Sequence, residues 1–490
     1  MEKIQKFEID KKTLIKTLLC FGIIGLFWIL PPVAPITKVG MKTIGIFIGT
    51  VLLLTLVDTT WPAFLSFALL SISGSLSMNE VLAGSIGNWI ITFVIASFVL
   101  TEALNSSGFT RRLTIGFMTR PFVSKSPWLF TISYLFIAWI VGLFMDSVAA
   151  VLFFLPFTDV ILKGLGYTKE DNYSHMLTIG VVFAINIAGI GTPISHSLIL
   201  LGMGILSESA GINVTMFDFI KYGLPLSFIL FILLFLVLRL LFKVDLSNFK
   251  NFNIKETLGD VEKMDLKEKT VVTIFFGTVF FWVFPGLLDL IFPQGNFLTQ
   301  FFARFSITFW ALLGMVLLSI IRINNKPIVC LKTTIENGFN WGIIFFIAIG
   351  VLLGTAMSHE SVGLNEFIIL HLTPILDKIP IPLVVLIIAF TSTALTNAAS
   401  NVTTITIMTT VAISLAQSLP SVNVVALAFT ATASGALAFV LPSSYAPIAL
   451  LHADKNSNSA KVIKYGILMV VLCSILVAFI GYPLYVSIFQ

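Results

Sequence analysis

The chain has 490 residues, 57% of them hydrophobic and 11% charged, and its mean hydropathy is +1.02. Average soluble domains carry roughly 25% charged residues, and a soluble chain of this size still needs a polar exterior. The composition therefore excludes a soluble enzyme, a disordered chain and a disulfide scaffold. The long continuous apolar runs exclude a barrel of alternating strands. We expect an all-α integral membrane protein.

A helix that spans a membrane needs about 20 mostly apolar residues. The first candidate, 14–30, resembles a signal peptide, but it ends in Trp28 and Pro31 with no small residues for cleavage, so we expect an uncleaved span. The later candidates are 41–57, 60–77, 89–104, 127–163, 174–205, 218–242, 270–292, 304–321, 341–357, 380–418, 422–450 and 464–487.

Two of these segments, 127–163 and 380–418, are nearly twice the length of a span and polar at their centres. This pattern favours re-entrant helical hairpins over two tight spans each. With the N-terminus inside, all but five of the 29 Lys and Arg residues then lie inside, as the positive-inside rule requires. We therefore predict about 11 transmembrane spans plus two re-entrant helical hairpins, in the cell (plasma) membrane with a cytoplasmic N-terminus.

The two halves of the chain repeat at an offset near 250 residues. Asn88 and Trp89 open a span in the first half as Asn340 and Trp341 do in the second. A polar-centred hairpin and then a span broken by small residues and proline follow in each half. In the predicted topology the first hairpin opens to the inside and the second to the outside, so the two halves form an inverted repeat. The expected domains are an N-terminal segment and first span (1–40), a first repeat (41–242), a charged cytoplasmic linker (243–269) and a second repeat (270–490).

Broken helices at matching positions of two inverted halves indicate the central site of a transporter. Half-helix N-termini favour an anionic group, and unwound carbonyls with Ser, Thr or Asn oxygens suit a small cation. Asp146 lies mid-segment, where a carboxylate is costly enough to suggest function. It could bind sodium, carry a proton or hold a hydroxyl network, whereas Glu102 is assigned no role. His196 and Tyr445 follow the two breaks and are candidate hydrogen-bond donors.

Each of these features also has a structural interpretation. Serine and threonine often bond to carbonyls of their own helix, and small residues allow close helix packing. Two hairpin tips at matched positions, each followed by a matched break, favour the functional interpretation.

From about residue 40 to 485 the chain resembles the divalent anion:sodium symporter family. The stretches 57–108 and 341–363 are similar in layout to the openings of that family's two halves, and 191–193 matches its first break. The second hairpin tip keeps Ser400 and Asn401 of the family's Ser-Asn-Thr. The first tip, 146–148, keeps none of it, and the residues after both breaks also differ.

The resemblance implies an elevator-type homodimer that transports di- or tricarboxylates, either with sodium as a symporter or by anion exchange. The expected substrate-binding residues are Ser147, Thr192, His196, Ser400, Asn401, Ser444 and Tyr445. The possible sodium ligands are Asp146, Ser147, Gly191, Ser195, Thr396, Ala399 and Asn401.

Two other functions stay open. One is a cation/proton antiporter of the same superfamily that uses Asp146 as its exchanging site. The other, an intramembrane hydrolase using Ser147 or Ser400 with His196, rests on residue types alone, since the sequence has no recognisable catalytic motif. We expect no enzyme activity and no cofactor beyond sodium. The expected partners are a small organic anion, the lipid bilayer and a second copy of the chain, without nucleic acid.

Overall fold

The computed structural model describes residues 10–58, 60–251, 254–259, 263–292, 296–337, 341–371, 373–376 and 378–489. Residues 1–9 of the expected first domain and Asn340 of the repeat lie outside this part. Within it the chain is nearly all helical, with one two-stranded hairpin of β1 (Arg322–Ile323) and β2 (Lys326–Pro327). Nine described helices are long and apolar enough to cross a membrane, and six further apolar helices are shorter. The all-α membrane fold is thus confirmed.

The helices of the first half run from the N-terminus to the charged linker. They are α1 (Lys11–Ile29), α2 (Lys38–Leu56), α3 (Trp61–Ser73), α4 (Met78–Gly84), α5 (Trp89–Ser106), α6 (Phe109–Met118), η1 (Val123–Lys125), α7 (Pro127–Gly142), α8 (Ser147–Gly164), α9 (Asn172–Ala188), α10 (Ser197–Ala210) and α11 (Met216–Leu241).

The linker holds η2 (Ser247–Asn251) and α12 (Ile254–Leu258). The second half contains α13 (Leu266–Ile291), α14 (Phe297–Ala303), α15 (Ile307–Ile320), α16 (Leu331–Asn337), α17 (Trp341–Ser358), η3 (Glu360–Val362), α18 (Leu364–His371), α19 (Thr373–Leu376), α20 (Ile381–Ala398), α21 (Asn401–Ser418), α22 (Val424–Gly435), α23 (Ala446–Ala453), α24 (Ser459–Leu476), a π-helical turn at Val477–Gly481 and α25 (Tyr482–Phe489).

The linker is shorter than the sequence suggested, because α13 begins at Leu266, inside the expected range 243–269. Asp265 caps this helix by accepting from the Glu268 N–H, which allows the helix to start within a charged stretch. Glu268 also pairs with Arg112 of α6 (2.6 Å), so the start of α13 is fastened to the first half.

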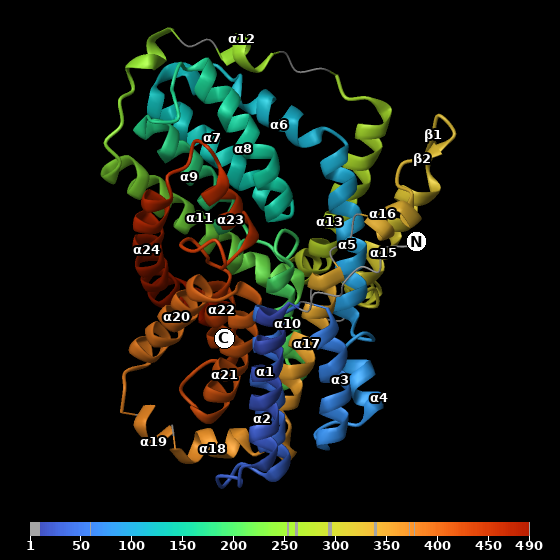
Figure 1. Ribbon diagram of the computed structural model, residues 1–490. Helices are drawn as coiled ribbons and strands as arrows, with labels where there is room; N and C mark the ends of the chain where they lie inside the picture. Colours follow the sequence, from blue (N-terminus) through green and yellow to red (C-terminus); the bar gives the residue numbers. More distant parts are fainter. Residues whose placement is uncertain are drawn as a thin grey trace, which may run out of the picture.

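Each half contains a helical hairpin with a short turn. α7 and α8 are joined by 143–146, and α20 and α21 by 399–400. Figure 1 shows the first hairpin in the upper half of the view and the second in the lower half. The first hairpin covers 127–164 and the second covers 381–418, so both match the predicted segments 127–163 and 380–418 to within one residue at each end.

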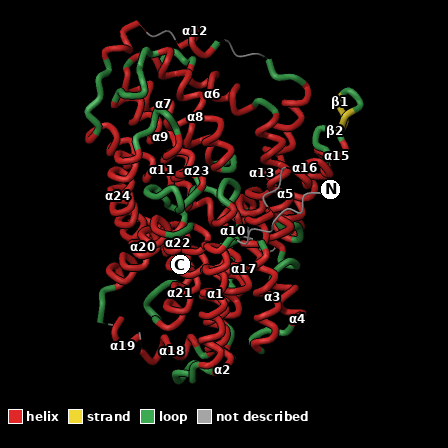
Figure 2. Tube along the Cα trace, viewed as in Figure 1, coloured by secondary structure: helices red, strands yellow, loops and turns green. Residues whose placement is uncertain are grey.

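Each half also contains a helix interrupted deep in the molecule. The chain leaves helical conformation at 189–196 between α9 and α10, and at 436–445 between α22 and α23. Figure 2 shows these loop segments among the helices in the middle of the molecule. Most residues of both segments are buried, so their backbone groups need partners from neighbouring elements.

Candidate functional site

The first hairpin tip carries an acidic side chain. Asp146 precedes α8, and its Oδ1 accepts hydrogen bonds from the backbone N–H groups of Val148 (2.9 Å) and Ala149 (3.2 Å). Aspartate is favoured there because it satisfies first-turn N–H groups, and the helix dipole favours its charge. The tip is fastened to the first broken helix, because the Thr192 hydroxyl donates to the Leu143 carbonyl oxygen.

The second hairpin tip brings several oxygen atoms together. Asn401 Oδ1 lies 2.8 Å from the Thr396 hydroxyl, which is also 2.6 Å from the Gly435 carbonyl oxygen. Asn401 Nδ2 donates to the Ala436 carbonyl (3.3 Å), and its backbone N–H donates to the Ser444 carbonyl (3.3 Å). Unwound carbonyls beside a hairpin tip are groups that coordinate sodium in transporters. Two predicted sodium ligands, Thr396 and Asn401, therefore meet at one place.

Three helix N-termini around the tips differ from that of α8. Their N-caps are His196 for α10, Ser400 for α21 and Tyr445 for α23, and in these described residues none makes a side-chain capping bond. Ala399, another predicted sodium ligand, ends α20 directly before Ser400. Uncapped N-termini present N–H donors and the positive end of the helix dipole, which together favour an anion.

The two broken helices restart side by side. The His196 ring stacks on the Tyr445 ring, with centroids 5.2 Å apart and planes at 21°. Tyr445 also has Ser147 and Asp146 of the first tip as polar neighbours. His196 is 2% exposed, and its Nε2 has no hydrogen-bond partner among the described residues. The stacked pair thus joins the starts of α10 and α23 to the first tip.

The predicted residues Thr192, Ser195 and Ser444 lie in the same region, and all three hydroxyls donate to main-chain carbonyls. Thr192 donates to the first tip, and the Ser444 hydroxyl donates to Leu441 (2.5 Å). Ser195 Oγ lies 3.4 Å from the Thr192 carbonyl oxygen. A Cβ on Gly191 would come within 2.6 Å of a Leu143 side-chain carbon, so this glycine permits close packing of the break against the tip.

Asn397, which the sequence analysis missed, holds the second break in place. Its Nδ2 donates to the carbonyls of Thr393 (2.8 Å) and Leu437 (2.9 Å). Its Oδ1 accepts from the N–H groups of Phe439 (2.6 Å) and Val440 (2.8 Å). An amide side chain within an apolar span, three residues before a predicted tip, was the available signal.

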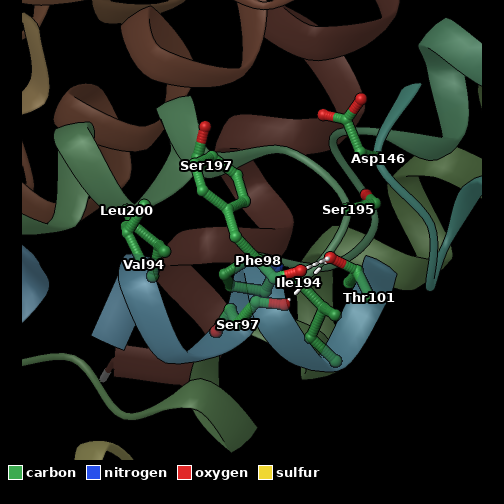
Figure 3. A pocket seen from close by; sticks show the side chains of 10 residues that line it. Val94, Ser97, Phe98, Thr101, Asp146, Ile194, Ser195, Ser197 and Leu200 are labelled. Atoms are coloured by element: carbon green, nitrogen blue, oxygen red, sulfur yellow. Dashed lines mark hydrogen bonds between the residues drawn. The ribbon is translucent and has the colours of Figure 1, made fainter. Parts of the chain in front are cut away.

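Two cavities lie beside the first tip. One of about 10 Å³, drawn in Figure 3, is lined by Val94, Ser97, Phe98, Thr101, Asp146, Pro193, Ile194, Ser195, Ser197 and Leu200. The other, of about 240 Å³, is lined by Phe98, Thr101, Glu102, Asn105, Met145, Asp146, Val148, Ala149 and Ile343. The sequence did not predict the residues of α5 that line these cavities, because the residues on the opposite walls are distant along the chain.

Comparisons with known proteins identify relatives of the chain. A family model described as the sodium:sulfate symporter transmembrane region matches residues 11–488. An uncharacterized transporter of Haemophilus influenzae is 23% identical over 92% of each chain. The sodium-dependent dicarboxylate transporter SdcS of Staphylococcus saprophyticus is 22% identical over 89% of this chain and 86% of its own.

A solved structure shares the fold. The YdaH transporter of Alcanivorax borkumensis superposes with a TM-score of 0.60 at 13% identity, over 97% of this chain and 99% of that one. The family match, on a fold shared with a solved transporter, defines a multi-pass membrane transporter, not an enzyme. The chain belongs to the sodium:sulfate symporter family, and the predicted family resemblance is confirmed.

Proposed function

We propose that the protein is a secondary active transporter of small organic anions, di- or tricarboxylates, working by sodium-coupled symport or anion exchange. The observation that carries this proposal is the convergence of three uncapped helix N-termini, those of α10, α21 and α23, beside the two tips. The name of the SdcS relative, a sodium-dependent dicarboxylate transporter, supports both the substrate class and the ion.

The substrate carboxylate binds where these helix ends meet. The second tip contributes Ser400 and Asn401, and the Ser444 carbonyl is bonded to the Asn401 N–H. The two restarting helices contribute an aromatic wall and hydrogen-bond donors through His196 and Tyr445. Ser147 and Thr192 complete the set from the first half. Donor groups without a formal positive charge suit a substrate that must be released again after each crossing.

Sodium binds at two places in this proposal. The second-tip site uses Thr396, Ala399 and Asn401 with the carbonyl oxygens of Gly435 and Ala436. The first-tip site uses Asp146, Ser147, Gly191 and Ser195. A cation at the first tip also offsets the charge of Asp146, which otherwise repels a substrate carboxylate.

The proposed mechanism is elevator-type alternating access in a homodimer in the plasma membrane, with a cytoplasmic N-terminus. In this proposal both hairpins are re-entrant. The 16 residues of α7 rise about 24 Å, less than the roughly 30 Å of a hydrocarbon core, which supports the first; α8 and α20 are each long enough to cross. Each hairpin moves with the broken helix to which it is hydrogen-bonded, through Thr192 in the first half and Asn397 in the second.

Uptake of radiolabelled succinate into proteoliposomes tests the proposal. Uptake into empty vesicles under an inward sodium gradient identifies symport. Uptake only into vesicles preloaded with unlabelled succinate identifies exchange. If neither occurs, and succinate, malate, 2-oxoglutarate and citrate all fail to protect the purified protein against thermal unfolding, the proposal is wrong.

A cation/proton antiporter is the second candidate, and the placement of Asp146 at both cavities favours it. Proton release on sodium addition, with no inhibition by dicarboxylates, would identify this function. Asp146→Asn tests the role of the carboxylate in either case, because it keeps the shape and removes the charge. We expect it to change the cation or pH dependence of transport more than substrate choice. Unchanged ion dependence would make the carboxylate structural.

A further inference from the structure

A cavity of about 490 Å³ lies apart from the proposed transport site, since none of the described residues that line it belongs to a hairpin or a break. It is bounded by the starts of α5, α11 and α15, the end of α13, and α14 with the residues that follow it. Figure 1 shows α5, α13 and α15 together at the right of the view. In the predicted topology these helix ends lie on the outer side of the membrane. The cavity therefore lies where the headgroups of the outer leaflet meet the acyl chains.

The walls of this cavity are largely aromatic. Five rings from separate elements line it, those of Trp89, Phe217, Trp282, Phe302 and Phe305. The Trp282 indole N–H donates to the Ile307 carbonyl (3.0 Å), so its polar atom is satisfied and its ring offers apolar surface. Trp282 lies nine residues before the end of α13, about 14 Å along the helix axis. The cavity thus extends from the membrane surface into the hydrocarbon.

One edge of the cavity carries a pair of opposite charges. Asp218 and Lys221 are the charged side chains among the described residues that line it. They form an ion pair in the first turns of α11 (2.8 Å), and their side chains are 27% and 33% exposed. The Thr215 hydroxyl donates to the second oxygen of Asp218 (2.6 Å), and Lys221 Nζ lies 5.1 Å from the centre of the Phe217 ring. This edge has no net charge and presents an anion and a cation side by side.

A zwitterionic headgroup complements such an edge. Its ammonium group can donate to the Asp218 carboxylate while its phosphate accepts from Lys221. Partly exposed ion pairs contribute little free energy, so opening this pair to admit the headgroup costs little. A headgroup with a net negative charge is attracted by Lys221 but repelled by Asp218. The pair therefore favours an ethanolamine headgroup, whose ammonium carries N–H donors, over choline and glycerol headgroups.

The surface beside the cavity is apolar. Ile291 at the end of α13 and Phe297 and Phe301 on α14 are exposed, and α14 packs against α13. Such a patch marks contact with a membrane, and it adjoins Phe302 of the cavity wall. The cavity volume is that of a small-molecule pocket, roughly 300 to 1,000 Å³, which admits a headgroup and the upper part of one acyl chain.

We propose that a phospholipid with an ethanolamine headgroup binds in this cavity. Its ammonium group lies at Asp218, its phosphate at Lys221, and the first part of one acyl chain against the Trp282 and Phe302 rings. The rest of the lipid stays in the outer leaflet, along the exposed face of α14. This site is separate from the proposed anion and sodium sites, so its test does not depend on transport.

Native mass spectrometry of the delipidated full-length protein in detergent, titrated with phosphatidylethanolamine, tests the site. We expect one lipid per chain to bind more tightly than the others. Asp218→Asn and Lys221→Gln should each weaken its binding severalfold, as expected for partly exposed charges. Val214→Trp should remove it, because the added ring fills the cavity without changing its charge. Asp218→Asn should also abolish the preference over phosphatidylglycerol, which a merely structural role of the carboxylate would not change.

Matched variants on the same predicted side of the membrane serve as controls. Lys42 lies over an aromatic ring (5.0 Å) as Lys221 does, and Glu80 is the third residue of its helix as Asp218 is. Lys42→Gln, Glu80→Gln and Val33→Trp should leave the binding of phosphatidylethanolamine unchanged. Thermal unfolding and size-exclusion profiles show whether each variant folds. If the cavity-filling variant fails to fold, the two charge variants keep the test usable because their side chains are partly exposed.

Three results would contradict the proposal. Wild-type lipid binding by Asp218→Asn, Lys221→Gln and Val214→Trp alike would overturn the site. Equal binding of phosphatidylethanolamine and phosphatidylglycerol by the wild type would overturn the assignment of the headgroup. Displacement of the lipid by glycerophosphoethanolamine, the same headgroup without chains, would show that a soluble aminoalkyl phosphate occupies the cavity instead of a lipid.

Discussion

Two asparagines four residues apart at the second tip have different surroundings. Asn397 uses both amide protons and both lone pairs of its oxygen on main-chain groups of α20 and the second break. Asn401 contacts one hydroxyl and one carbonyl, both groups that can also coordinate a cation. The sequence predicted Asn401 through its place in a tip motif. It could not predict Asn397, whose partners lie about 40 residues away.

We therefore expect opposite phenotypes from the two alanine variants. Asn397→Ala leaves buried main-chain groups unpaired and should cost at least about 2 kcal/mol of stability, seen as a lower unfolding midpoint in detergent. Asn401→Ala should keep the wild-type midpoint and abolish sodium-dependent uptake. Robust uptake by Asn401→Ala would overturn the assignment of the second tip, and a stable Asn397→Ala would show that the break does not depend on this amide.

At the scale of elements, the hairpins and breaks were predictable because their signals are local. A segment of double length with a polar centre predicts a hairpin, and glycine and proline within an apolar run predict a break. The association of α5 with the first tip was not predictable from the sequence. The pattern of α5 is that of an ordinary membrane span, and Glu102 lies near the end of that span. Only the folded chain brings Ser97, Thr101 and Glu102 next to Asp146.

The second break is also supported from outside by α24. A Cβ on Gly466 would lie 2.5 Å from the Phe439 carbonyl oxygen, which belongs to the unwound backbone. Gly466→Ala must therefore displace that backbone, and we expect lower substrate affinity together with a lower unfolding midpoint. Gly277→Ala on α13 is the control, since its Cβ would meet nothing within 4 Å and alanine favours helix. Equal behaviour of the two variants would contradict a role for this contact.

At the scale of the whole molecule, elevator movement requires the first hairpin to slide past α5. Asn105 on α5 and Val148 on the hairpin line the same cavity, so we place cysteines at both positions in a chain without Cys20, Cys330 and Cys473 and treat it with a bifunctional thiol reagent that contains a disulfide. We expect cross-linking to stop transport and reduction to restore it, while each single cysteine leaves transport unchanged. Full transport by the cross-linked protein would show that the hairpin stays with α5.

Chemical labelling of Cys330 tests the orientation of the chain in the membrane, because Cys330 is exposed whereas Cys20 and Cys473 are buried. The Thr333 hydroxyl donates to its sulfur (3.3 Å) and lowers the pKa of the Cys330 thiol, so more reactive thiolate is present at neutral pH. A membrane-impermeant maleimide should label it in inside-out vesicles and not in intact cells. Thr333→Ala should shift the pH dependence of labelling upward. Labelling from the cell exterior would reverse the predicted topology.

The capping carboxylate at the first tip has an electrical consequence. In the proposed mechanism, a first tip loaded with sodium carries that ion and Asp146 as a neutral pair, whereas an empty first tip carries the single negative charge of Asp146. Moving a unit charge through the whole membrane field changes the energy by about 2.3 kcal/mol per 100 mV. With the cell interior negative, the voltage draws the unloaded hairpin outward. The contribution of the first tip to the voltage dependence of transport therefore falls on its return without sodium.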